Sequence, residues 1–255
     1  GSFNVGVGYH SLTTNTTGHS NAALGNNSLE ANTTGTNNTA LGCASLASNT
    51  TAAGNTAVGL SAMLSNTTGA NNVGLGLLSL AANTTAADNT AVGACAMCKN
   101  TEGHSNVAVG HCALFTNTGG DTNTAVGHHA LKLNTTAADN TAVGRNALCT
   151  TTTGCVNTAV GSSAMQSNTT GDENVAIGGG ALYDNTTADH NTAVGHNAAT
   201  NTTTGKDNTV VGSSALFTNT TGHDNIVIGC GALYSNTSGA DNVGIRYQAL
   251  YNNTS

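Results

Sequence analysis

The sequence predicts an all-β protein, a β-solenoid (β-roll or β-helix) of 15 coils with one 17-residue repeat per coil. An Asn recurs every 17 residues from Asn4 to Asn242 without one insertion, so the 255 residues hold a whole number of repeats. Counted from that Asn, the repeat reads Asn-Thr-Ala-Val-Gly, two variable residues, Ala-Leu, two variable residues, Asn-Thr-Thr-Gly and two variable residues. A short fixed period indicates units that bury little alone and must stack on their neighbours.

The composition favours one ordered, repetitive domain. Only 7% of the residues are charged and there is no Pro or Trp. Low charge and weak hydrophobicity are also typical of disordered tracts, but the strict placement of Val and Leu in every repeat favours an ordered core. No shift in composition marks a boundary, so residues 1–255 are expected to form a single continuous domain, a window of a longer fibre.

Charge and hydropathy argue against two classes of partner. The net charge of −7 is spread along the chain without a basic stripe, so binding to nucleic acid is not expected. No apolar run approaches the roughly 20 residues that span a bilayer, so no membrane association is expected.

The first half of each repeat predicts a short strand and a corner. Position four is Val, Leu or Ile in every copy, from Val7 to Ile245, and position nine is Leu, Met or, once, Ala199. Both are expected to point into the core. Because side chains alternate along a strand and these positions are an odd distance apart, the chain should turn at the Gly of position five. Arg246 is the single exception to that Gly and is expected to weaken its corner.

The second half of the repeat predicts two more corners, at Asn-Thr-Thr-Gly and at the Asn of position one. The invariant Thr of position thirteen is expected to face inward and form a hydrogen-bonded ladder, and the Asn of position one to form an amide ladder. Positions three and eight, occupied mostly by Ala, Ser and Gly, are expected to face outward. Residues this small suit the close approach of another chain, although a tight corner would also require them.

The Asn-Thr-Thr stretch is also an N-glycosylation sequon, and turn chemistry explains the same residues without sugar. The in-frame candidates are Asn15, Asn32, Asn49, Asn66, Asn83, Asn134, Asn168, Asn185, Asn219, Asn236 and Asn253. Out of frame, the sequon occurs at Asn26, Asn37, Asn201 and Asn252. Full occupancy is not expected, because coils stacked about 4.8 Å apart would crowd the glycans.

Seven cysteines occur, and two of them are placed for a disulfide. Cys95 and Cys112 share position seven of adjacent repeats, a separation that suits a disulfide, while isolated small residues are the other interpretation. Cys95 and Cys98 form a Cys-x-x-Cys pair, but no second pair completes a zinc site, so no metal and no cofactor are expected.

An aromatic ladder is predicted at position ten of three consecutive repeats, Phe217, Tyr234 and Tyr251. These rings could stack on sugar rings or simply pack on one another, and packing is the preferred interpretation.

No catalytic site is expected. The His residues and most of the acids occupy variable positions that are expected to face solvent. No Ser, His and acid recur in a triad spacing, and no carboxylate pair keeps a fixed relation. The protein is therefore not expected to be an enzyme.

The phrases Asn-Thr-Ala-Val-Gly, Ala-Leu and Asn-Thr-Thr-Gly resemble the repeat region of phage tail-fibre and microbial surface-fibre proteins, along the whole chain. They are also similar to the Asn-Ser-Val-Ala-Ile-Gly repeats in the head domains of trimeric autotransporter adhesins (YadA-like), although the coil there is shorter. That resemblance implies left-handed β-rolls assembled in threes, an extracellular fibre or adhesin shaft at a cell or virion surface, and no catalytic residue.

Two functions follow as hypotheses. The first is a stiff extracellular filament or fibre shaft formed by axial stacking and by lateral packing of copies, with a trimer favoured. The alternative is an adhesin or tail-fibre-type receptor-binding protein whose variable positions contact a cell surface and its glycans. Ice binding by Thr arrays is the weakest hypothesis, because the most regular Thr is expected to face inward.

Overall fold

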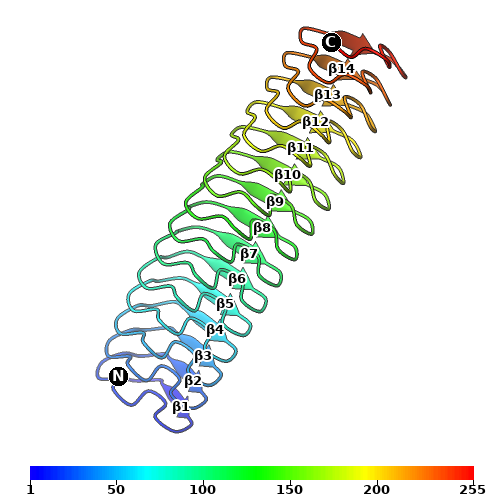
Figure 1. Ribbon diagram of the computed structural model, residues 1–255. Helices are drawn as coiled ribbons and strands as arrows, with labels where there is room; N and C mark the ends of the chain where they lie inside the picture. Colours follow the sequence, from blue (N-terminus) through cyan, green and yellow to red (C-terminus); the bar gives the residue numbers. More distant parts are fainter. The chain divides into compact units, whose positions relative to one another are not determined.

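The structure, a computed structural model, describes all 255 residues and contains strands but no helix. It comprises two compact units, Gly1–Asn123 and Thr124–Ser255, and each is a β-solenoid with one repeat per coil (Figure 1). The strands of the first unit are β1 (Val5–Val7), β2 (Ala22–Leu24), β3 (Thr39–Leu41), β4 (Thr56–Val58), β5 (Val73–Leu75), β6 (Thr90–Val92) and β7 (Val107–Val109). The strands of the second unit are β8 (Thr124–Val126), β9 (Thr141–Val143), β10 (Thr158–Val160), β11 (Val175–Ile177), β12 (Thr192–Val194), β13 (Thr209–Val211), β14 (Ile226–Ile228) and β15 (Val243–Ile245). The predicted β-solenoid is confirmed, whereas the single continuous domain stays a prediction.

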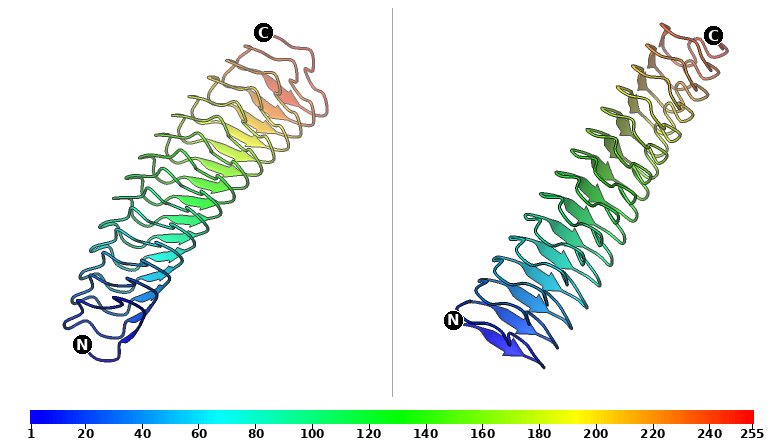
Figure 2. Two further views of the ribbon diagram at one scale, coloured as in Figure 1. Left: turned by 60° about the horizontal axis from the view of Figure 1, so that its bottom comes forward. Right: turned by 60° about the vertical axis from the view of Figure 1, so that its left-hand side comes forward.

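Within each unit the strands are parallel and pair in sequence order, with every residue opposite its equivalent 17 positions along the chain. Thr158, for example, pairs with Thr141 on one side and with Val175 on the other. The strands line one face of each unit, and the turns close the coils on the other side (Figure 2). No helix that could cross a membrane is present.

The turns are also hydrogen-bonded from coil to coil. The Gly59 N–H donates to the Leu41 carbonyl at 2.8 Å, and the Met63 N–H donates to the Ser79 carbonyl at 2.9 Å. Equivalent bonds recur in the neighbouring coils. Because buried backbone groups need partners, these bonds allow the coil to close although only three of its 17 residues are in a strand.

The interior of each coil is narrow and holds one large side chain, except where Ala199 takes its place. Position nine supplies it, as predicted: Leu46 and Met63 are fully buried. Ala57 at position three and Ala62 at position eight are fully buried beside them. The space is tight, since a Cβ on Gly74 would lie 2.9 Å from Met63 Cγ. One buried Leu or Met contributes about 1.5–3 kcal/mol, so each coil also depends on its hydrogen bonds.

The predicted orientation of the strand is wrong. Position four points outward, with Leu24 49% exposed and Ile177 41% exposed. Position three is buried instead, with Ala23 only 2% exposed and Ala176 fully buried. The strand alternates as expected, but its middle residue, which is Ala, Gly or Val, faces in because no larger side chain fits beside the residue of position nine. The predicted outward surface of small residues at positions three and eight is therefore wrong, because these residues fill the core.

The corners also differ from the prediction. Gly59 at position five has a φ of 132°, as expected for the first corner. Positive φ further occurs at positions seven, nine and seventeen, as at Ser61 (54°), Met63 (53°) and Asn71 (58°), and not at the Asn of positions one or twelve. Left-handed backbone costs roughly 1–2 kcal/mol and suits β-branched residues least. Position nine is never Val, Ile or Thr, although Thr122 and Val156 adopt this conformation at position seventeen.

The invariant Thr of position thirteen lies at the surface of the coil and not inside it, contrary to the prediction. Thr33 and Thr50 are half-buried. The Thr33 hydroxyl donates to the Thr50 carbonyl at 3.1 Å, and the Thr50 hydroxyl donates to the Thr67 carbonyl at 3.1 Å. The predicted hydroxyl ladder is thus present, but the residue that this turn directs inward is the preceding Asn of position twelve.

Candidate functional site

Two columns of buried asparagine side chains run along the interior of each unit, the position-one column and the position-twelve column. In the first column, Asn55 Oδ1 accepts the backbone N–H of Asn72 at 2.9 Å, and Asn55 Nδ2 donates to the Gly69 carbonyl at 2.9 Å. In the second, Asn66 Nδ2 donates to Asn49 Oδ1 at 3.0 Å and to the same Gly69 carbonyl at 2.9 Å. The buried carbonyl of position fifteen therefore joins the two columns.

An amide side chain is both donor and acceptor, so identical residues can pair along an axis without limit. The position-one column confirms the predicted amide ladder. The position-twelve column was missed, because Asn-Thr-Thr is equally a turn motif and a sequon. One signal could have revealed it: position twelve is Asn in 13 of 15 repeats, and its only replacements, Thr151 and Thr202, still carry a hydrogen-bonding group.

Thr202 interrupts the position-twelve column in the second unit. Its hydroxyl lies 3.5 Å from Asn219 Nδ2, at the limit of a hydrogen bond. On its other side, the buried Asn185 Oδ1 accepts no hydrogen bond. An unpaired buried acceptor costs about 1–3 kcal/mol, so this coil carries a local defect.

Thr202→Asn is expected to stabilise the second unit by about 1–2 kcal/mol. The new amide can donate to Asn185 Oδ1 and accept from Asn219 Nδ2, which repairs the column. Urea unfolding followed by circular dichroism measures the change. Thr204→Asn is the matched control, because Thr204 is exposed in the same turn and the substitution should be neutral. Equal effects of the two variants would contradict the role assigned to the column.

The in-frame sequon asparagines are these same position-twelve residues. Nine of the eleven candidates are completely buried, and only those of the first and last repeats, Asn15 and Asn253, are half-buried. Within the folded coil, the Nδ2 atom that would carry a sugar donates hydrogen bonds, as at Asn49. Among the out-of-frame sequons, Asn26, Asn37 and Asn252 are exposed. In the folded protein, a glycan would therefore find the exposed out-of-frame asparagines accessible and the buried in-frame asparagines inaccessible. Occupancy of any of these sites stays a prediction.

The outward side chains of positions two and four form the outer strand face. It is uncharged and largely apolar, with Val, Leu or Ile at position four and Thr, Val, Ile or Ala at position two, and no repeat has a charged residue at position two, three or four. At the start of the first unit, this face includes a shallow depression of about 300 Å³ lined by Val5, Val7, Leu24 and Leu41. Exposed apolar side chains in a continuous row are typical of surfaces that contact a partner.

The predicted aromatic ladder is present. The rings of Phe217 and Tyr234 stack with centroids 5.1 Å apart and an interplanar angle of 6°, and Tyr234 stacks on Tyr251 at 5.0 Å and 7°. All three are half-buried. The geometry supports mutual packing, the preferred interpretation, and each side chain stays partly exposed.

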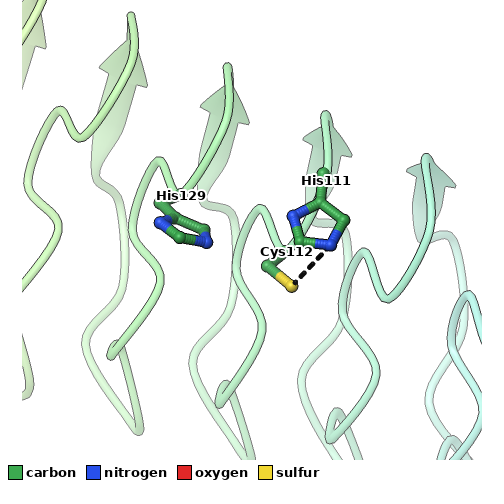
Figure 3. Close-up of side chains that lie close together, drawn as sticks. All are labelled: His111, Cys112 and His129. Carbon is green, nitrogen blue, oxygen red and sulfur yellow. Dashed lines mark hydrogen bonds between the residues drawn. The ribbon is translucent and has the colours of Figure 1, made fainter.

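The seven cysteines are free thiols in the structure. Cys95 and Cys112 are both half-buried on adjacent coils, and their disulfide stays a prediction. Burial, together with the neighbouring Cys95 and Cys112, raises the pKa of the Cys98 thiol. The Cys112 sulfur lies 3.6 Å from His111 Nε2 (Figure 3).

The ionisable side chains form exposed pairs at the turns. His190 Nδ1 lies 3.2 Å from Asp207 Oδ1, and His223 Nδ1 lies 2.8 Å from Asp224 Oδ2. Surface pairs of this kind contribute at most about 1 kcal/mol. No nucleophile is joined to either pair in the hydrogen bonds described, and the expectation that the chain is not an enzyme stays a prediction.

Comparison with known proteins finds no matching family model, curated protein or solved structure. The resemblance to fibre repeats therefore depends on the repeat motifs alone.

Proposed function

We propose that this protein is a structural element, a stiff extracellular filament or fibre shaft that holds distance between its two ends. The observation that carries the proposal is the continuity of hydrogen bonding along the stack. Strands, turns, hydroxyls and two buried amide columns all bond from coil to coil, as at Asn66 and Thr50. Bending or stretching such a unit would require many of these bonds to lengthen together.

Lateral association of copies is the second part of the proposal. Copies would pack through the outer strand face, and not through the small residues of positions three and eight, which lie in the core. It is free of charge, and each added repeat lengthens it by about 4.8 Å, so the apolar area available for packing grows with the number of coils. Because association requires well over 1,000 Å² of buried surface, a long face is better suited to it than a short one. The trimer implied by the resemblance is the favoured assembly.

Replacing Ile177 and Ile228 by Asp is expected to dissociate the oligomer without unfolding the chain. Both side chains are about 40% exposed on the outer strand face, so the charge would be solvated in a monomer and desolvated in an interface. Light scattering coupled to size exclusion measures the mass, and circular dichroism checks the fold. The matched control places Asp at Thr187 and Thr221, which are exposed at position fourteen.

A wild-type chain that is monomeric at high concentration would contradict lateral packing. An oligomer that survives the Ile substitutions but dissociates in the control would place the interface on another face. Electron micrographs that show no elongated particles would contradict the filament itself.

The adhesin remains the second candidate function. The observation that favours it is the aromatic ladder, whose three stacked rings are only half-buried and so stay partly exposed for contact with a glycan. A glycan array probed with the wild type and with Tyr234→Ala tests it, since signals lost only in the variant would support binding at the ladder.

A further inference from the structure

One exposed corner of each coil carries a hydroxyl residue that no contact within the chain explains. Position fourteen, the second Thr of Asn-Thr-Thr, is Thr in 11 of the 15 repeats and Ser in two. Its threonines form the position-fourteen column: Thr17, Thr34, Thr51, Thr68 and Thr85 in the first unit, and Thr136, Thr153, Thr170, Thr187, Thr204 and Thr221 in the second. All of them are exposed, and none of their hydroxyls forms a hydrogen bond within the chain.

The threonine of position thirteen, one residue earlier, has a structural role. The Thr169 hydroxyl donates to the Thr186 carbonyl at 2.9 Å, and the Thr186 hydroxyl donates to the Thr203 carbonyl at 3.1 Å. These bonds between coils account for a Thr at position thirteen in every repeat. At Thr187 only the backbone takes part, since its N–H donates to the Thr203 carbonyl at 3.4 Å. The fold therefore uses the hydroxyl of position thirteen and not that of position fourteen.

Neither the turn nor the Asn-linked sequon requires a hydroxyl at position fourteen. Glu102 stands there in one repeat and Gly119 in another, and the Glu102 N–H still donates to the Thr118 carbonyl at 2.8 Å. Where Thr151 and Thr202 replace the Asn of position twelve, the in-frame sequon is lost, yet position fourteen is still Thr. The hydroxyl is therefore retained independently of the turn and of the sequon.

Other exposed positions change freely from repeat to repeat. Position six holds Tyr9, Asn26, Cys43 and Leu60 in the first four repeats, and all four are exposed. Position fourteen is just as exposed, but it keeps a hydroxyl in all repeats except those of Glu102 and Gly119. A hydroxyl that recurs at the surface without a partner in the chain indicates a role toward something outside the chain.

We propose that the position-fourteen threonines are attachment sites for short O-linked sugars. Stalks rich in Ser and Thr carry O-linked sugars on hydroxyls of this kind. The threonine oxygen attacks the anomeric carbon of a sugar that is activated as a nucleoside diphosphate. The bond between that carbon and the phosphate oxygen breaks, and the nucleoside diphosphate leaves. The hydroxyl proton passes to a base of the glycosyltransferase, and no group is oxidised or reduced.

The spacing of the coils limits the size of each sugar. Successive acceptors lie one coil apart, about 4.8 Å. Rings fit at this spacing in the second unit, because Phe217, Tyr234 and Tyr251 stack on consecutive coils with centroids 5.1 and 5.0 Å apart. A single sugar ring per acceptor therefore suits the column, whereas a branched glycan on every coil does not. Position fourteen lies outside the strands, so such sugars would leave the outer strand face bare.

The test compares positions thirteen and fourteen in the full chain isolated from its native source. Its intact mass should exceed that of the sequence by a whole number of sugar residues. Electron-transfer fragmentation, which preserves attached sugars, should place them on Thr187 and Thr204 and not on the adjacent Thr186 and Thr203. Alkali should release them by β-elimination, whereas an enzyme that cleaves Asn-linked glycans should leave them in place.

Two single substitutions, made in the native source, separate the acceptor from its neighbour. Thr187→Val removes the hydroxyl but keeps the shape of the side chain, so it should remove the sugar of that coil alone. Thr186→Val is the matched control and should leave every sugar in place. Circular dichroism checks that both variants fold.

A native mass equal to that of the sequence, sugars found only on asparagine, or equal occupancy of positions thirteen and fourteen would each overturn the proposal. The proposal does not rest on the fibre shaft, and the two can fail separately. Filaments built from unmodified chains would refute the sugars alone. Modified chains that form no elongated particles would support the sugars and contradict the filament.

Discussion

Gly93→Ala is expected to destabilise the first unit by about 3 kcal/mol or more and to lower its melting temperature by about 10 °C. Gly93 has a φ of 131°, which L-residues rarely adopt, and an added Cβ would lie 2.6 Å from the carbonyl oxygen of Gly110 on the next coil. A rotamer change can relieve neither the strained φ nor the short contact, because both involve only Cβ and backbone atoms. Thermal and urea unfolding followed by circular dichroism measure the loss.

Gly119→Ala is the matched control in the same unit. A Cβ there would meet no atom within 4 Å, and the residue has no positive φ, so the change should stay within about 0.5 kcal/mol. Similar melting temperatures for the two variants would contradict the steric account of position five. Arg246 also has a φ of 131°.

Asn66→Ala is expected to cost about 3 kcal/mol, the second large effect. Loss of the Asn66 amide removes the group that donates to Asn49 Oδ1 at 3.0 Å and the oxygen that accepts from Asn83 Nδ2 at 2.8 Å. Asn49 and Asn83 are both buried. Each buried polar group left without a partner costs about 1–3 kcal/mol. Because Asn83 Nδ2 still donates to the Ala86 carbonyl, the main penalty falls on Asn49. Urea unfolding measures it.

A graded series sharpens this second test. Asn66→Thr should fall between the wild type and Asn66→Ala, because the chain already accommodates Thr at position twelve in two repeats. Thr68→Ala, two residues away and exposed, should be nearly neutral. If Asn66→Ala proved no more harmful than Thr68→Ala, the asparagine column would not stabilise the stack.

Much of the architecture could be predicted because the repeat supplies the same information 15 times. The period alone indicates stacked coils, and Leu or Met at position nine identifies the single large core residue, as Leu46 confirms. The Gly of position five marked a corner with positive φ, and the register placed Phe217 over Tyr234. These features depend on one residue and its equivalent 17 positions away, which the sequence displays directly.

The sequence by itself thus determined the period, the class of fold and the residues that repeat along the axis. Only the tertiary structure decided which way they face. A strand of three residues alternates correctly in either orientation, so Ala57 inside with Val58 outside could not be distinguished locally from the reverse. The choice depends on the width of the closed coil, which admits one large side chain from position nine and the Asn of position twelve. That width is set by the turns that close the coil and not by the three residues of the strand.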